Sequence, residues 1–435
     1  MKLSEIIEVF IAGDWGNESQ TKDTPYAVSC VRGADIVPIQ NNEFRDIPLR
    51  YISLRSFENK LLQEGDIVVE KSGGSPTQAT GRAVYISKEL LSATRSMVCS
   101  NFCIAFRVKQ GWNPYFVYQY WQHLYNRGIF FNFEGKTSGI KNLQLDIVLS
   151  TIEIEPYSVE EQNTIAKQLQ LIEQKIGLNR AINHNLEAMA KQLYDYWFVQ
   201  FDFPDKDGKP YKSSGGEMVW NEKLKREVPE GWFVSNICRI ADILSGGTPQ
   251  KVVSEYWENG VIPFFGPTDY RGDIFQIETI DHITQNGLNH CASSLFEEGT
   301  IIITARGSIG KLVILGKPMA MNQSCYALQS KRGEYEYLYF LTIQLIEYLK
   351  TKGSGSVFKS IIASDIENSF LCIANAETIT RFCTTTNPLL QRIKQSTLEI
   401  SELTKQRDKL LPLLMNGQVK VGVECSRLNY DLSHD

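Results

Sequence analysis

The sequence predicts two copies of an α/β (α+β) globule, separated by two long helices that form an antiparallel coiled coil. Three observations carry this prediction. One strand-and-loop pattern occurs twice in the 435 residues. Each copy mixes short β-branched runs with Gly, Ser and Pro turns, which is typical of a mixed α/β globule. Each copy is also followed by a polar segment with apolar residues at heptad spacing, which indicates a long helix.

The repeated pattern reads LLQEGDIVVEKSGGSPTQATGRAVYI at residues 61–86 and LFEEGTIIITARGSIGKLVIL at residues 295–315. The two align at an offset of 234 residues, and the same offset places Gly13 on Gly247. Farther along, CSNFCIAFRV resembles NQSCYALQSK and KTSGIKN resembles KGSGSVFKS, at smaller offsets that loop insertions would produce. Because two matches share one offset, we interpret the chain as a tandem duplication of a unit of roughly 200 residues, far longer than a solenoid repeat.

The parts follow in the same order in both copies. The predicted boundaries are residues 1–155 for the first globule, 156–200 for the first spacer helix, 201–233 for a Pro/Gly/Ser-rich linker, 234–375 for the second globule, 376–416 for the second spacer helix and 417–435 for a C-terminal tail. A helix of about 40 residues would be roughly 60 Å long. As an antiparallel pair the two helices would hold the globules apart. Two helices that pack on their own globules are the alternative.

The apolar residues of both helices follow the 4,3 spacing of a coiled-coil seam. In the first helix this spacing predicts a phase slip near the middle, where Asn179 and Asn183 lie on the seam. Ser396 and Arg407 interrupt the second seam. A polar seam residue lowers stability but fixes the register. The predicted apolar seam comprises Ile165, Leu169, Ile172, Ile176, Ile182, Leu186, Met189, Leu193, Tyr196, Leu389, Ile393, Ile400, Leu403, Leu410 and Leu414.

Composition is that of an ordinary globular protein, with 43% apolar and 22% charged residues. No apolar run reaches the roughly 18 residues that a membrane span needs, and the N-terminus does not read as a signal peptide. The nine cysteines are scattered without metal-ligand spacing, so we expect a cytoplasmic chain that binds no metal. The net charge of -5 argues against a wholly basic nucleic-acid binder, but it is compatible with basic faces.

Motifs for catalysis are incomplete. GSIGKL lacks the spacing of a P-loop, and Leu312 stands where the hydroxyl residue is needed. WNPYF lacks the second proline of an amino-methyltransferase motif. GDIVVEKS supplies Asp66, Glu70 and Lys71, but adjacent strand residues point to opposite faces, which opposes a metal-dependent nuclease centre. The five histidines form no triad or metal spacing.

The two copies share Gly/Ser loops flanked by cations, which is chemistry suited to a nucleic-acid backbone. Glycine lets a phosphate approach backbone amides, hydroxyls donate hydrogen bonds, and lysine or arginine supplies charge. Ordinary surface turns are the alternative. The candidate DNA-binding residues are Lys71, Ser72, Gly73, Arg82, Lys136, Ser138 and Lys141 in the first copy, and Arg306, Ser308, Lys311, Lys352, Ser354 and Lys359 in the second.

Other loops are candidates for reading bases, since Arg, Asn and Gln can reach base edges. They comprise residues 45–60 in the first copy and 265–276 in the second. The aromatic stretch at residues 113–136 could stack bases, but its counterpart at 336–355 keeps the helical apolar spacing with more aliphatic residues. We therefore expect a core helix that packs on a sheet.

The order of these motifs resembles that of a known family, the specificity (S) subunits of type I restriction-modification systems. Each copy opens with an ILSGGTPQ-like stretch, carries an EGTIIITARGSIGK-like strand and loop, and closes with KGSGSVFKSI-like residues before a helix. Residues 158–203 and 377–421 are similar to the two spacer helices of that family. The resemblance covers nearly the whole chain. The first copy departs from it with GDWGNES at residues 13–19 and with a longer loop after residue 70.

The resemblance implies that each globule is a target-recognition domain for one half of a bipartite, asymmetric double-stranded DNA site. Domain centres would then lie about one DNA turn apart, roughly 34–36 Å. Two methyltransferase (modification) subunits on the spacer helices and motor-nuclease (restriction) subunits would be the partners. S-adenosylmethionine, ATP and Mg would bind those partners, and this non-catalytic chain would bind no cofactor. Adenine methylation and ATP-dependent cleavage would be the result.

Two other functions remain open from the sequence. A simplified restriction system in which this chain cuts DNA itself is opposed by the incomplete catalytic motifs. A duplicated coiled-coil scaffold that binds protein partners without DNA is compatible with the same helices and globules. Salt-dependent DNA binding would distinguish the scaffold from the two functions that require binding to DNA.

Overall fold

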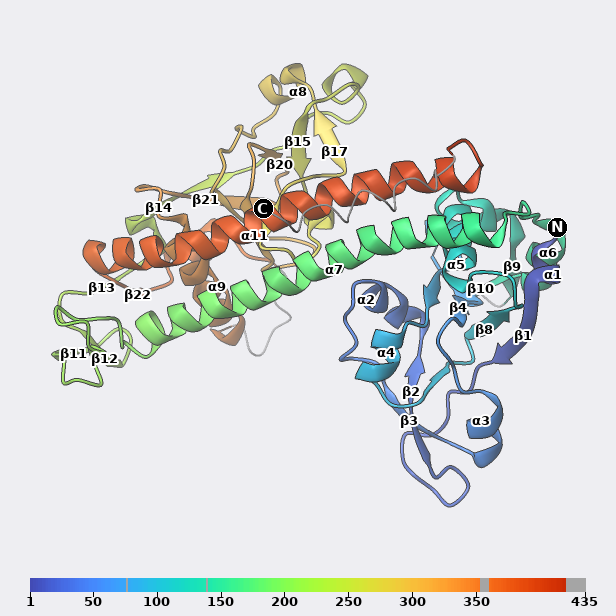
Figure 1. The fold of residues 1–435 in the computed structure, drawn as a ribbon. Coiled ribbons are helices and arrows are strands. Elements are labelled where there is room, and N and C mark those ends of the chain that lie inside the picture. Colours follow the sequence, from blue (N-terminus) through green and yellow to red (C-terminus); the bar gives the residue numbers. More distant parts are fainter. Residues whose placement is uncertain (76, 138–139, 353–359, 420–435) are drawn as a thin grey trace, which may run out of the picture. The chain divides into compact units, whose positions relative to one another are not determined.

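The computed structural model describes residues 1–75, 77–137, 140–352 and 360–419, with the backbone alone for Lys136, Thr137 and Lys352. The chain divides into two compact units (Figure 1). The first unit comprises Met1–Gly177 and Leu403–Asp435, and the second comprises Leu178–Glu402. Each unit therefore contains one globule and parts of both long helices, α7 (Val159–Tyr194) and α11 (Ala376–Met415).

The first unit is built on a four-stranded antiparallel sheet in the order β1-β8-β4-β6. Its strands are β1 (Ile7–Ala12), β4 (Ile67–Glu70), β6 (Ala83–Tyr85) and β8 (Cys103–Val108). All four residues of β4 are buried because the strand lies inside the sheet with covered faces. Helix α5 (Pro114–Asn126) packs on this sheet through Phe116 and Trp121, so the expected core helix is confirmed.

Two smaller sheets complete this globule. One has the order β3-β2-β7, in which β2 pairs parallel with β7, and the other has the order β5-β10-β9. Their strands are β2 (Tyr26–Val31), β3 (Leu49–Ile52), β5 (Ser72–Gly73), β7 (Met97–Cys99), β9 (Glu134–Thr137) and β10 (Ile140–Leu143). The short helices are α1 (Leu3–Ile6), α2 (Ile36–Gln40), α3 (Leu54–Asn59), α4 (Lys88–Ala93) and α6 (Leu145–Thr151).

The second globule repeats this topology, with a main sheet in the order β14-β21-β18-β19-β16 and a smaller sheet in the order β17-β15-β20. The strands are β14 (Ala241–Ser245), β15 (Ile262–Phe265), β16 (Phe275–Gln276), β17 (Asp281–Ile283), β18 (Ile301–Thr304), β19 (Leu312–Leu315), β20 (Ala320–Met321) and β21 (Cys325–Ser330). Helix α9 (Tyr335–Lys352) packs as α5 does, and α8 (Gln285–Asn289), α10 (Ala363–Glu367), β13 (Phe233–Ser235) and β22 (Leu371–Ile373) complete the globule.

Hydrogen bonds establish the correspondence between the copies. The N–H of Glu70 donates to the carbonyl of Arg82 at 2.8 Å, and the N–H of Thr304 donates to that of Lys311 at 2.9 Å. Gly81 and Gly310 then fold back onto the carbonyls of the same two strand ends, Glu70 and Thr304. The duplication therefore holds in three dimensions, and the loop inside this hairpin is longer in the first copy.

At the first strand of each copy the alignment predicted from the sequence is wrong by one residue. Register along β1 shifts between Ile7 and Val9, whereas β14 pairs without interruption, so β1 contains a one-residue bulge. Beyond this bulge, Asp14 donates to the carbonyl of Cys99 just as Gly247 donates to that of Met321. Gly13 therefore corresponds to Gly246, and not to Gly247.

In the second unit the two long helices run antiparallel, as predicted. The amide of Asn179 donates to Glu399 at 2.8 Å, and that of Asn183 donates to Thr397 at 3.1 Å, so the partner number falls as the α7 number rises. Ser396 is fully buried between them. The hydrogen bonds of the two asparagines form only when the helices are in register, which is how polar seam residues specify it.

The parts of the helices in the first unit pair in the same direction. Arg407 donates to Glu173 at 2.9 Å, and the hydroxyl of Tyr157 donates to the carbonyl of Leu414 at 2.9 Å. Figure 1 shows α7 in green and α11 in red. Leu414 and the neighbouring Met415 are buried in the core of the first globule. The end of the chain's last described helix thus stabilises the first globule.

The predicted phase slip in α7 does not occur. Met189 and Tyr196, which were assigned to the seam, are 54% and 37% exposed, whereas Ala190 and Trp197 are buried. One heptad position continues through α7 and the π turn that follows it (Asp195–Val199): Leu169, Ile176, Asn183, Ala190 and Trp197. The predicted slip came from counting only apolar residues as seam residues. The prediction was wrong because Asn183 occupies a seam position and the heptad period continues through it.

Residues 201–233, which the sequence assigned to a linker, contribute buried side chains to the core of the second unit, namely Phe201, Phe203, Val228 and Trp232. Phe203 stacks on Trp232 with ring centroids 5.0 Å apart, and Phe201 meets the same indole edge-on at 5.5 Å. A hairpin of β11 (Met218–Asn221) and β12 (Arg226–Pro229) follows. Pro and Gly content correctly indicated turns, but the aromatic residues between these turns pack in the same core cluster as residues of α7 and α11.

Candidate nucleic-acid interface

Most of the predicted loops lie at one end of each main sheet. In the first copy β1 and β4 end there and β8 and β6 begin there, because neighbouring strands of this sheet are antiparallel. The parallel strands β2 and β7 end on the same side. The same holds for β14, β18, β21 and β19 in the second copy. We call these two regions the strand-end loops.

A buried ion pair shapes the strand-end loops of the first copy. Arg82 donates to both carboxylate oxygens of Glu70, at 2.8 and 2.7 Å, and this hydrogen bonding raises the pKa of the guanidinium. Glu70 is almost fully buried, and Gly33 and Gly73 pack directly against it. A Cβ at Gly33 would lie 2.3 Å from the carboxylate. Arg82 therefore has a structural role, and its contact with DNA stays a prediction.

The neighbouring candidates are also engaged within the fold. Lys141 pairs with Glu134 at 2.9 Å, with both side chains largely buried. Burial would raise the pKa of Glu134, but hydrogen bonds from Lys141 and Thr80 lower it below its ordinary value. Ser72 donates to Asn142 at 2.5 Å across the β5–β10 pair. Lys71 is half-buried beside these groups.

In the second copy the candidates are more open. Thr304 replaces the buried glutamate, and its hydroxyl donates to the carbonyl of Ser308 within the tight loop. Arg306, Ser308 and Lys311 are exposed. The Lys311 ammonium lies 5.3 Å from the ring centre of Tyr270. Exposed cations on a rigid loop can reach a phosphate without breaking an internal ion pair.

Some of the predicted residues cannot be placed. Lys136 lies in β9 and Lys352 at the end of α9, with only their backbones described. Ser138, Ser354 and Lys359 lie outside the described residues, as does most of the predicted tail. Ile361 nevertheless donates to the carbonyl of Ala305 as Leu143 does to that of Lys71, so both copies return to the sheet at the same point.

A structural role repeated in both copies was missed by the sequence comparison. The carboxylate of Asp35 accepts the N–H of Arg32 at 2.8 Å, and that of Asp269 accepts the N–H of Gly266 at 2.8 Å. Both aspartates are buried and close the turn after β2 and β15. The shared signal was an aspartate four residues after the last residue of the strand, in VRGAD and FGPTD.

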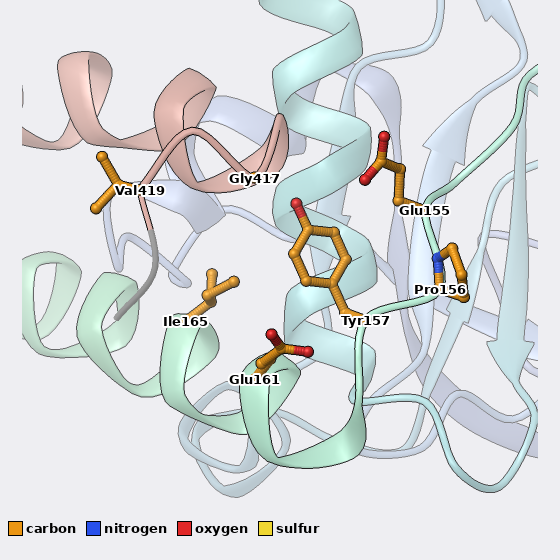
Figure 2. Close-up of a pocket in the computed structure, with 7 residues that line it drawn as sticks. All are labelled: Glu155, Pro156, Tyr157, Glu161, Ile165, Gly417 and Val419. Atoms are coloured by element: carbon orange, nitrogen blue, oxygen red, sulfur yellow. The ribbon is translucent and has the colours of Figure 1, made fainter. Parts of the chain in front are cut away.

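A cavity of the first unit lies away from the strand-end loops. Figure 2 shows this cavity of about 310 Å³, beside the start of α7 and the residues after α11. Tyr157, Ile165 and Val419 form its apolar wall, and Glu155 and Glu161 its acidic rim. Two carboxylates at the rim repel phosphate, so this cavity does not suit a nucleic-acid backbone.

The acidic residues of the nuclease-like stretch are engaged in ion pairs. No cluster of His, Cys, Asp and Glu in the described part of the chain could hold a metal ion. Asp66, the first acid of the nuclease-like stretch, pairs with Arg107 at 2.8 Å, just as Glu70 pairs with Arg82. Within the same ranges, no helix combines the length and apolar character needed to cross a bilayer.

Two copies of one α/β domain, each joined to one helix of an antiparallel pair, define a tandem-domain subunit with two equivalent strand-end surfaces. Sequence comparison agrees with this architecture. The family described as type I restriction modification DNA specificity domain matches residues 1–188 and 229–377. The chain therefore belongs to the family of type I restriction-modification specificity subunits.

Individual relatives are consistent with this assignment. The MjaIX specificity subunit of Methanocaldococcus jannaschii is 30% identical over 63% of this chain, and the match spans 62% of that relative's length. The HindI specificity subunit of Haemophilus influenzae is 23% identical over 66% of this chain and 73% of its own. The crystal structure of the S subunit from M. genitalium has the same fold, with a TM-score of 0.55, 16% identity and 95% coverage of both chains.

Proposed function

We propose that this chain recognises a bipartite, asymmetric site in double-stranded DNA, each globule reading one half. The observation that carries the proposal is the structural duplication of the strand-end loops. Their framework is the same in both copies, but the exposed side chains differ, as two different half-sites would require. The first copy holds a buried Glu70–Arg82 pair where the second has Thr304 and the exposed Lys311.

In this proposal the chain supplies recognition, and its partners supply the chemistry. Modification subunits that bind S-adenosylmethionine would methylate adenine in each half-site, and motor-nuclease subunits would use ATP and Mg to translocate and cleave. Exposed apolar residues on α7 support docking of a protein there. Leu178 and Met189 are 62% and 54% exposed and lie about three turns apart on one side of the helix. Large apolar side chains that are exposed on one side of a helix can serve as anchors for a protein partner.

Methylation mapping tests the proposal. The chain is co-expressed with its cognate methyltransferase, and methylated adenines are mapped across the host genome. We expect a motif of two short half-sites with a fixed gap, and exchanging residues 1–155 for those of a relative should change only one half. A stable complex that yields no methylated motif would favour the protein scaffold. Cleavage by the isolated chain would favour the self-cutting alternative.

A salt titration tests the exposed cations of the second copy. Arg306→Ala and Lys311→Ala should each reduce the slope of log affinity against log salt by about one, because each removes one phosphate contact. Binding should weaken by a similar factor on cognate and random DNA. Lys88→Ala, which removes an exposed cation of the first globule beyond the end of β6 that lies away from the strand-end loops, is the control. An unchanged slope for both loop variants would remove these residues from the interface.

A further inference from the structure

Each globule has a turn between two neighbouring strands, and the hydrogen bonds of this turn are the same in both copies. In the first copy it joins β7 to β8, and the N–H of Cys103 donates to the carbonyl of Ser100 at 2.9 Å. In the second it joins β20 to β21, and the N–H of Cys325 donates to the carbonyl of Asn322 at 3.3 Å. Each turn therefore places two residues at its tip, between the same pair of strands.

Backbone contacts hold this tip rigidly in both copies. The carbonyl of Phe102 accepts N–H groups from residues 71 and 72, and that of Ser324 accepts them from residues 305 and 306. A glycine packs against the turn on the other side. A Cβ at Gly13 would lie 2.0 Å from the carbonyl oxygen of Ser100, and one at Gly246 would lie 2.3 Å from that of Asn322. The tip cannot shift without losing these contacts.

The tips carry the same functional group although their sequences differ. Asn101 in the first copy and Gln323 in the second are exposed primary amides at the equivalent position. The hydroxyl of Thr248 hydrogen-bonds to the amide of Gln323, which fixes the plane of that amide. Their neighbours diverge, since Phe102 is 56% exposed where the second copy has Ser324. Both amides are exposed at the tip of a turn that the backbone holds in place, so they remain accessible to a ligand although Gln323 also accepts a hydrogen bond from Thr248.

A primary amide has the donor and acceptor pattern that matches adenine. It can donate to N7 and accept from the N6 amino group at once in the major groove. Arg306 is exposed next to the tip of the second copy. Its guanidinium can contact a phosphate while the amide contacts a base. The strand-end loops thus combine a backbone-binding cation with a rigid, base-reading amide.

We propose that Asn101 and Gln323 each read an A·T pair, Asn101 in the half-site of the first globule and Gln323 in that of the second. This inference rests on the proposed recognition of a bipartite DNA site. For each half-site, the inference names one residue that reads a base pair and the kind of base pair that it reads. Each globule would then recognise adenine with the same part of its framework, and Phe102 or Ser324 would tune the flanking position.

Methylome mapping of point variants tests the inference. The wild-type chain with its methyltransferase first defines the two half-sites. Asn101→Ala should then relax one A·T position of one half-site by about 5- to 150-fold in relative methylation, the discrimination expected of one bidentate amide contact. Gln323→Ala should do the same in the other half-site only. Asn126→Ala and Gln329→Ala, which remove exposed amides away from the tips, are matched controls.

The outcomes separate this inference from the proposed function. If the wild type gives a bipartite motif but both tip variants keep it unchanged, the amide inference is overturned while the proposed function stands. Relaxation at a G·C position would overturn the adenine assignment. If the wild type itself gives no motif, the proposed function fails first. If a tip variant loses all methylation, hydrogen exchange of β8 or β21 shows whether the variant is folded. A folded variant that binds random DNA but does not direct methylation supports base reading by the amide.

Discussion

Replacing Arg82 by alanine is expected to destabilise the first unit by about 3–5 kcal/mol, the cost of leaving one partner of a buried ion pair alone. Glu70 is only 5% exposed and makes two hydrogen bonds to Arg82. Gly33 and Gly73 pack directly against its carboxylate. Hydrogen exchange of β4 and β6 measures the effect, and the β18–β19 hairpin of the second unit is the internal reference.

A double variant provides a second readout. Glu70→Thr with Arg82→Lys, which copies the residues of the second unit, should recover most of the stability. Normal stability of Arg82→Ala with a loss of DNA affinity would instead give Arg82 the DNA-binding role predicted from sequence.

Replacing Phe382 by alanine is expected to cost the second unit about 3–5 kcal/mol, as for other fully buried phenylalanines. Phe382 on α11 is fully buried. Its ring meets Phe198 edge-on at 5.0 Å and Trp197 at 5.8 Å, which joins the start of α11 to the end of α7. Hydrogen exchange of these two helix ends should rise while that of α5 in the first unit stays unchanged.

A matched control is Phe370→Ala, since Phe370 is 40% exposed in the same unit and should cost much less. Near-ultraviolet circular dichroism follows the aromatic cluster directly. Equal effects of the two substitutions would contradict the assignment of Phe382 as the central contact. Full loss of the cluster signal with unchanged exchange of α11 would show that helix pairing depends on the polar seam around Asn183 instead.

Local sequence patterns predicted the duplication of the globule and the two long helices. The duplication was visible because a buried strand followed by a tight turn needs β-branched residues and then glycine or serine at fixed spacing, as in residues 66–73 and 300–307. The heptad spacing of apolar residues predicted the two long helices. Their pairing with each other was predicted because each has an apolar seam that the other can cover. The family resemblance depended on the order of these same local motifs.

Tertiary contacts decided the rest. Sequence spacing could not show that Arg82 pairs with Glu70, that a bulge in β1 shifts Gly13 onto Gly246, or that Asn183 keeps the heptad in phase. Sequence similarity paired the stretches around Cys103 and Cys325, but only the hydrogen bonds of the two turns show that Asn101 and Gln323 occupy equivalent positions. A periodic pattern reports which face of an element is buried. Only the packed structure shows which polar groups meet there, since their partners come from distant segments.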